Sequence, residues 1–277
     1  MQARNLQLRL VRAAFQLAGT IAPGAAAVAA ERLFTTPPRH TPPERERAFL
    51  ATGERFEIPL GARRLAAWRW GSGPLVLLVH GWGGRAGQFA SFVPALVGAG
   101  YSTVAFDAPG HGDSGDRRSS LPDFAAALYA AASMLGPSHA IVGHSLGAAA
   151  VTLALSDGVE AARALFLAPP ADPGAYVTRF AERLAIPPAA IAGMRDRLSK
   201  RLRFDWQSLH VPTLARGMRI PLLVVHDWAD TEIPEADGRA IAAAWPDSTF
   251  ISTAGLSHRK ILHYPEVVER AVAWLAG

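Results

Sequence analysis

The chain has 277 residues, of which 50% are apolar and 18% are charged, so it can bury a substantial core and is not disordered along its whole length. It contains no cysteine, which excludes disulfides, thiolate-bound zinc, iron–sulfur centres and a cysteine nucleophile. The net charge of +5 lies in residues 1–64, while residues 65–277 are neutral overall. No nucleic-acid-binding motif accompanies the surplus, so we expect no nucleic-acid partner.

The first 30 residues have the pattern of a basic amphipathic helix, because polar and apolar residues recur at helical spacing on opposite faces. The polar residues are Asn5, Arg9, Arg12 and Gln16, and the apolar residues are Leu6, Leu10, Ala14 and Leu17. The favoured interpretation is a helix packed on the body of a soluble, cytoplasmic protein. Three alternatives stay open: an export signal, a transmembrane span, and peripheral contact of residues 1–30 with a membrane. The first two fit poorly, since Gln16, Thr20 and Pro23 interrupt the apolar run.

A Pro-rich, charged stretch at residues 35–47 is expected to be a connector, so that residues 1–54 form an N-terminal helix and linker. From residue 55 the pattern becomes that of an α/β domain extending to residue 277. Residues 56–60 and 64–70 predict a hairpin. Later apolar runs predict buried strands at Leu75–Val79, Ser102–Phe106, Ala140–Val142, Ala164–Leu167, Leu222–Val225 and Thr249–Ser252.

Helical patterns fall between these strands, at Gln88–Val97, Leu121–Leu135, Leu146–Ser156, Pro234–Ala244 and Pro265–Leu275. A hairpin followed by alternating strands and helices predicts a mostly parallel eight-stranded sheet with helices on both faces.

The stretch of about 169–219 is too long for an ordinary connection and predicts an inserted helical lid, with helices at Tyr176–Leu184 and Ala189–Leu202. Residues 179–219 hold nine basic and three acidic side chains. The basic run comprises Arg195, Arg197, Lys200, Arg201 and Arg203. The favoured interpretation is a solvated helix face, and the alternative is recognition of a substrate anion or an anionic surface.

The strongest motif is Gly143-His144-Ser145-Leu146-Gly147, which follows a predicted strand and precedes an Ala-rich helical run. This is the strand–turn–helix setting that G-x-S-x-G requires to expose a serine hydroxyl on a sharp turn. Ser145 is therefore the candidate nucleophile. A structural Gly-rich turn is the alternative.

A serine nucleophile needs a base and a group that orients the base. Asp230 follows the strand at 222–225, and His258 follows the last strand. Both lie at the carboxyl edge of the predicted sheet, where they could meet Ser145. Asp227 and Glu232 are rivals of Asp230 for the acid.

The stretch His80-Gly81-Trp82-Gly83-Gly84 follows the third predicted strand, and its glycines allow the backbone to approach a ligand closely. The N–H groups of Trp82 and Leu146 are the candidates for an oxyanion hole. Trp82 and His144 are the candidates for contact with the substrate, although a structural role is the simpler interpretation for His144.

Together these motifs resemble those of the α/β-hydrolase superfamily, and the likeness runs from residue 55 to the C-terminus. They are His80–Gly84, Asp107–Ser114, Gly143–Gly147, Asp230 within His226–Pro234, and His258. The resemblance implies the α/β-hydrolase fold, a Ser145–His258–Asp230 triad, and acyl transfer that needs neither a metal nor an organic cofactor. At one position the chain departs from the pattern, because relatives often have Gly where this chain has Asp227.

The expected function is hydrolysis of a carboxylic ester of a small-molecule acyl substrate through an acyl-enzyme on Ser145. Thioesterase, lysophospholipase, aminopeptidase and acyltransferase activities use the same triad and stay open. A non-catalytic ligand-binding protein on the same scaffold is the alternative of another class.

Overall fold

The computed structural model describes residues 2–277, with side chains from residue 6 onward. It divides into two compact units. Unit 1 comprises Met1–Thr36 and Asp172–His210, and unit 2 comprises Pro37–Ala171 and Val211–Gly277. The N-terminal helices and the inserted segment, which the sequence places in separate domains, thus belong to one unit.

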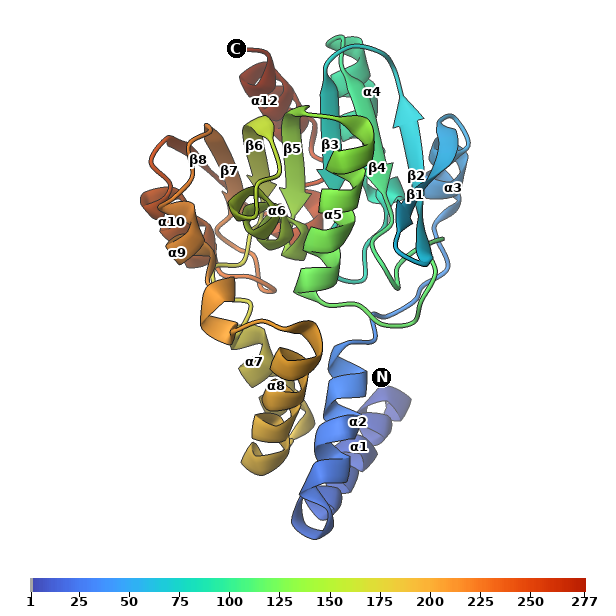
Figure 1. The fold of residues 1–277 in the computed structure, drawn as a ribbon, viewed down its shortest axis with the longest axis vertical. Coiled ribbons are helices and arrows are strands. Elements are labelled where there is room, and N and C mark those ends of the chain that lie inside the picture. The colour runs from blue at the N-terminus through green and yellow to red at the C-terminus, as the bar shows by residue number, and fades with distance from the viewer. Residues whose placement is uncertain (1) are drawn as a thin grey trace. The chain divides into compact units, whose positions relative to one another are not determined.

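Unit 2 is built on one eight-stranded sheet in the order β1-β2-β4-β3-β5-β6-β7-β8 (Figure 1). The strands are β1 (Glu54–Leu60), β2 (Arg63–Trp70), β3 (Leu75–Val79), β4 (Ser102–Phe106), β5 (Ser138–His144), β6 (Ala161–Leu167), β7 (Leu222–Asp227) and β8 (Ser248–Thr253). β2 pairs antiparallel with β1 and with β4, and the other neighbours run parallel. This confirms the predicted mostly parallel eight-stranded sheet.

Helices cover both faces of this sheet (Figure 1). On one face lie α4 (Phe92–Gly98) and α12 (Pro265–Ala276), which contact each other. Along the other face α5 (Leu121–Leu135) packs on α6 (Leu146–Ser156), and α9 (Val211–Ala215) lies between α6 and α10 (Glu235–Ala244).

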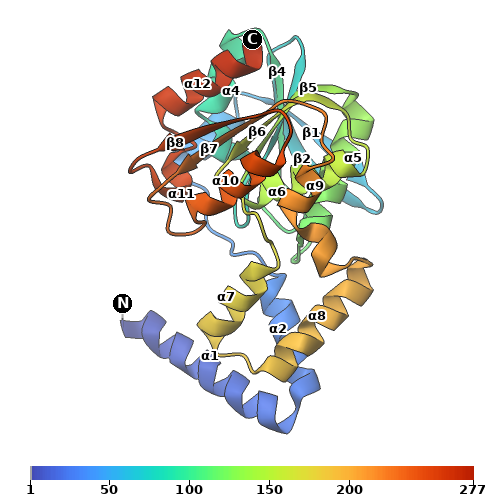
Figure 2. The ribbon, with the colours of Figure 1, turned by 90° about the vertical axis from the view of Figure 1, so that its left-hand side faces the viewer.

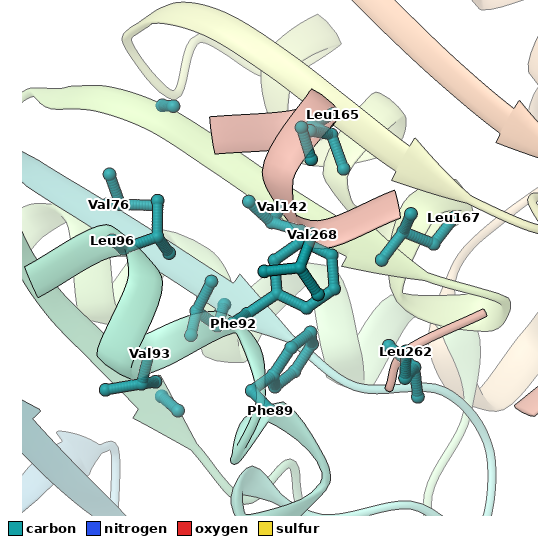
Figure 3. Close-up of a cluster of buried hydrophobic side chains, with 14 of the residues drawn as sticks. Val76, Phe89, Phe92, Val93, Leu96, Val142, Leu165, Leu167, Leu262 and Val268 are labelled. Atoms are coloured by element: carbon teal, nitrogen blue, oxygen red, sulfur yellow. The ribbon is translucent and has the colours of Figure 1, made fainter. Parts of the chain in front are cut away.

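Figure 3 shows the core beneath α4 and α12, where Phe89 and Phe92 belong to one apolar cluster with the strand residues Val142 and Leu167. Because helices cover both faces of the sheet, the side chains on both faces of the central strands are buried, which explains why these strands are largely apolar in sequence.

Two expectations about local structure were wrong. The connector at 35–47 ends early, because α3 (Glu44–Leu50) begins inside it, and the Phe49 ring of this helix stacks on Trp70 at 4.8 Å. The charged residues at the start of α3 gave no indication in the sequence that Phe49 would hold this helix against Trp70. The helix expected over 88–97 is divided into a 3₁₀ turn at Ala86–Phe89 and α4. Pro94 fits α4 because it lies in the first turn, where an N–H has no acceptor within the helix.

Unit 1 contains α1 (Gln2–Ile21), α2 (Pro23–Phe34), α7 (Ala175–Leu184) and α8 (Pro188–Leu202), and Figure 2 shows these four helices. α2 packs on α8, and α1 contacts α2 and α7. Their small core consists of Phe15, Ala26, Ala30, Val177, Ile186, Ala190, Met194 and Leu198. None of the helices in the described part of the chain is long and apolar enough to cross a membrane.

Much of the basic run of α8 is engaged inside unit 1. The buried carboxylate of Glu31 binds Arg197 at 2.7 Å and Arg201 at 3.0 Å. The Arg195 guanidinium lies 4.5 Å from the centre of the Trp206 ring, and Lys200 pairs with a carboxylate one turn away in α8. Arg197 and Arg201 therefore join α8 to α2, while Arg195 and Lys200 have partners in or next to α8.

Candidate active site

Ser145 occupies a strained turn between β5 and α6. Its backbone angles are φ 53° and ψ −126°, in a region that non-glycine residues rarely adopt and that costs about 1–3 kcal/mol. The surrounding structure holds it there, because its N–H donates to the Leu167 carbonyl at 2.9 Å and its own carbonyl accepts from the Ala148 N–H at 2.9 Å. The turn places the Ser145 hydroxyl within hydrogen-bonding distance of His258.

The two glycines of the motif are required by backbone packing. A Cβ at Gly147 would lie 2.3 Å from the Val79 carbonyl oxygen, and a Cβ at Gly143 would lie 2.6 Å from the Ala148 Cα. Both contacts are with main-chain atoms, which cannot rotate away. The first turn of α6 therefore approaches the end of β3 at Gly147, and the end of β5 at Gly143, only because side chains are absent at these positions.

The structure brings Ser145, His258 and Asp230 into one hydrogen-bonded chain. Ser145 Oγ lies 3.0 Å from His258 Nε2, and His258 Nδ1 lies 2.7 Å from Asp230 Oδ2. The three side chains come from the carboxyl ends of β5, β7 and β8, with His258 in the short helix α11 (Ser257–Lys260). All three residues are buried. These are the residues and the chain order expected from the sequence.

The carboxylate of Asp230 determines which nitrogen of His258 carries the proton. An ionised carboxylate only accepts hydrogen bonds, so Nδ1 donates to it. In the neutral imidazole this leaves the lone pair of Nε2 facing the Ser145 hydroxyl. The arrangement can therefore take the serine proton when the oxygen attacks an electrophile.

Asp230 is kept ionised by its surroundings. Burial acts to raise the pKa of this carboxyl, but polar contacts with His226 and His258 and the N–H of Ile233 outweigh it, so the pKa lies below its usual range. Oδ1 accepts from the N–H groups of Glu232 at 2.8 Å and Ile233 at 3.0 Å. Four polar groups thus fix both oxygens in position.

His226, for which the sequence pattern predicts no role, belongs to this site. Its side chain is fully buried, and Nε2 lies 3.6 Å from Asp230 Oδ2 and 3.1 Å from the Ile233 carbonyl. Because a carbonyl can only accept, Nε2 carries a proton and faces the carboxylate with positive polarity. The signal available was its position at the end of β7, four residues before Asp230.

The two rivals of Asp230 have other partners. Asp227 Oδ2 accepts from the Leu256 N–H and from the Thr253 hydroxyl, each at 2.9 Å, and so fastens the loop that carries His258. Burial opposes ionisation of Asp227, but these hydrogen bonds outweigh it and lower its pKa. Glu232 lies 3.6 Å from Arg259. At position 227, where relatives often have Gly, this chain therefore has a carboxylate that fastens the loop carrying His258.

His144 lies beside His258, with ring centres 4.8 Å apart. Burial and the charge of His258 lower the pKa of His144 to about 3, so the ring is neutral. Its Nε2 donates to the His258 carbonyl oxygen at 2.9 Å. This contact gives His144 a structural part in placing His258.

The loop after β3 brings its backbone against the nucleophile, since a Cβ at Gly81 would lie 2.7 Å from the Ser145 Cβ. The Gly81 carbonyl is held by the His80 Nδ1 at 2.7 Å and by the Gly84 N–H at 2.9 Å. In a trans peptide the carbonyl and the next N–H point in opposite directions, so the Trp82 N–H points away from these donors. Leu146 begins α6, where an N–H has no acceptor within the helix.

Two further buried groups support this loop. His111 Nε2 accepts from the Gly83 N–H at 3.0 Å, and its ring packs edge-on against Trp82 at 5.2 Å. Asp107 accepts from the N–H groups of Ala86 and Asp113, each at 2.7 Å, and burial raises the pKa of Asp107 to about 6. The sequence motif at 107–114 thus serves to brace the loop at 80–86.

His111 predicts a dependence of stability on pH. Burial, together with the charges of Arg39 and Arg85, lowers its pKa to about 4, against about 6.5 in the unfolded chain. Between these two pH values the unfolded state binds more protons than the folded state. The contribution of His111 to the free energy of unfolding is therefore complete above about pH 6.5 and is lost as the pH falls toward 4. The slope reaches about 1.4 kcal/mol per pH unit.

We expect His111→Gln to flatten this part of the curve, because the amide oxygen can accept from Gly83 without titrating. Urea unfolding between about pH 4 and 8 measures the slopes. Above about pH 7 the two proteins should have parallel curves. Parallel curves over the whole range would contradict the assignment. The raised pKa of Asp107 lowers stability as the pH rises, which is opposite to the effect of His111. Because Asp107 is present in both proteins, its effect cancels when the two curves are compared.

Among the residues that the structure describes, no group of three His, Asp or Glu side chains is arranged to hold a metal ion. The polar side chains at the sheet edge are instead bonded to one another and to the backbone.

A model of the alpha/beta hydrolase family matches residues 76–273, which covers the sheet from β3 onward and the whole site. The chain belongs to the alpha/beta hydrolase family. No curated protein matches the sequence.

Solved structures of other hydrolase-fold proteins are similar to this chain. An esterase of Pyrococcus furiosus is 21% identical with a TM-score of 0.66, over 87% of this chain and 100% of that chain. A bromoperoxidase of Bacillus anthracis is 19% identical with a TM-score of 0.62, over 80% and 99%. A serine hydrolase involved in carbazole degradation is 16% identical with a TM-score of 0.61, over 80% and 98%. At these identities the likeness establishes the fold.

Proposed function

We propose that this hydrolase cleaves carboxylic esters through an acyl-enzyme on Ser145. The observation that carries the proposal is the hydrogen-bonded chain from Ser145 Oγ through His258 to Asp230. A serine hydroxyl is a weak nucleophile near neutral pH, and this chain supplies the base and its orienting carboxylate. The Trp82 and Leu146 N–H groups act as the oxyanion hole, and the half-buried Trp82 side chain borders the acyl group.

The reaction proceeds in two halves. Ser145 Oγ attacks the ester carbonyl while its proton passes to His258 Nε2, and the negative charge on the carbonyl oxygen is held by the two N–H groups. His258 then returns the proton to the leaving alkoxide, which departs as the alcohol. Water attacks the acyl-enzyme, with His258 again taking and returning one proton, and the products are a carboxylic acid and free Ser145.

Esters are favoured over the other acyl substrates by similarity alone, since the Pyrococcus furiosus relative is an esterase. Thioesters, lysophospholipids, peptides and transfer to an alcohol would use the same acyl-enzyme. A non-catalytic scaffold is disfavoured, because binding alone does not require the strained turn that presents Ser145 to a base.

Labelling by a fluorophosphonate and hydrolysis of a panel of p-nitrophenyl esters with increasing acyl length test the proposal. We expect one label per chain in the wild type and none in Ser145→Ala. The matched control is Ser91→Ala, because Ser91 Oγ also lies near a histidine ring, 3.4 Å from His263 Nδ1, but outside the site. Labelling that persists in Ser145→Ala would refute the role of Ser145. A wild type that neither labels nor hydrolyses any ester would refute the activity.

A further inference from the structure

Helix α1 has apolar side chains on two faces, and only one of them is packed. Phe15 is buried in the core of unit 1, with Val11 and Ala18 beside it. Four other large apolar side chains lie on the surface: Leu6 is 60% exposed, Leu10 63%, Leu17 64% and Ile21 73%. A helix that only packed on its own unit would not need this second face.

The four exposed side chains form a continuous stripe. At about 100° per residue they fall within roughly 60° of one another around the helix axis, and Phe15 lies on the opposite side. The stripe runs from Leu6 to Ile21, which is the last residue of α1. Arg9 borders it about 60° from Leu6, and α1 contains no acidic residue. We call Leu6, Leu10, Leu17 and Ile21 the exposed stripe.

The net charge of unit 1 indicates which kind of surface the exposed stripe would bind. Unit 1 contains eleven Lys and Arg against five Asp and Glu, a net +6, whereas unit 2 contains seventeen against eighteen, a net −1. The whole positive surplus of the protein therefore belongs to the unit that carries the stripe. An apolar stripe bordered by arginine on a cationic unit is complementary to an anionic lipid surface.

We propose that α1 is an interfacial anchor, which lies along an anionic membrane with the exposed stripe among the acyl chains and Arg9 at the phosphates. The helix lies on the membrane rather than across it, since α1 does not meet the length and hydropathy of a spanning helix. A second copy of the chain is the disfavoured occupant. A symmetric contact through this stripe would bring two units of net +6 together.

The test is co-sedimentation of the full-length protein with phosphatidylcholine vesicles, with and without phosphatidylglycerol. We expect the wild type to pellet with the anionic vesicles, and to do so less as salt is raised. The double variant Leu10→Gln/Leu17→Gln should bind at least about tenfold more weakly, because each change removes apolar surface from the interface. Arg9→Gln should weaken binding about fivefold.

The matched control is Tyr129→Gln/Met134→Gln, which removes two large apolar side chains that are 54% and 51% exposed on α5 of unit 2. This variant should pellet like the wild type. Circular dichroism and activity on a soluble ester should be unchanged in all variants, which separates loss of binding from loss of folding.

Three outcomes would overturn the proposal. The first is a wild type that stays in the supernatant with anionic vesicles. The second is equal pelleting of the wild type and the α1 double variant. The third is a wild-type dimer in light scattering that the double variant dissolves, without any vesicle binding, which would assign the exposed stripe to a second copy.

Discussion

Ser145→Ala should lower kcat/KM for the best ester substrate by at least about four orders of magnitude. The variant keeps the backbone and loses only the hydroxyl that His258 activates, so folding should be nearly unchanged. Whatever rate remains comes from the oxyanion hole and from binding. Steady-state kinetics with the best p-nitrophenyl ester measures the loss.

The decisive control for Ser145→Ala is non-additivity. If the two residues act as one unit, the double variant Ser145→Ala/His258→Ala should be about as slow as Ser145→Ala alone. A double variant slower by the product of the two single losses would mean that His258 acts independently of Ser145. That result would contradict the mechanism even if each single variant were inactive.

The second large effect is expected from Asp230→Asn, which should lower kcat by about three to four orders of magnitude. The new amide can donate to His258 Nδ1, so the proton of the imidazole moves to Nε2. Nε2 then faces the Ser145 hydroxyl without a lone pair and cannot accept its proton. The loss therefore comes from the wrong tautomer and leaves the geometry intact.

The matched control is Glu232→Gln, two residues away on the same loop and paired at the surface with Arg259. We expect its kcat to stay within about threefold of the wild type. The reverse ranking, with Glu232→Gln inactive and Asp230→Asn active, would show that the acid had been misassigned. The kcat of Asp230→Asn as a function of pH should also lose the wild-type dependence on ionisation of the base.

Most of the sheet could be predicted because its signals are local. Each central strand is a short apolar run. The residues around Ser145 are glycines because the backbone there is packed too closely for a Cβ. The triad could be predicted as well, since the carboxyl ends of parallel strands meet at one edge. Chain order and strand ends brought His258 and the acidic loop after β7 to the site of Ser145, but they did not separate Asp230 from its rivals Asp227 and Glu232, which only the hydrogen bond to His258 does.

The features that escaped prediction depend on contacts between distant segments. His226 acts on Asp230 only because the loop after β7 folds back on its own strand end. α3 is held by the stacking of Phe49 on Trp70, and the charged residues before it gave no sign of that contact. The grouping of α1 and α2 with α7 and α8 joins segments separated by more than a hundred residues, which no local pattern reports.

This grouping also constrains how the protein is made. Three of the eight core residues of unit 1 lie in Met1–Thr36 and five lie in Asp172–His210, so the core cannot close until both segments have been synthesised. Synthesis proceeds at about 5–20 residues per second, so Phe15 and the apolar side of α2 stay exposed for roughly ten to thirty seconds before α7 and α8 have been made. During that interval the apolar side of the nascent N-terminal segment stays exposed, so a chaperone that covers it would protect the chain from aggregation.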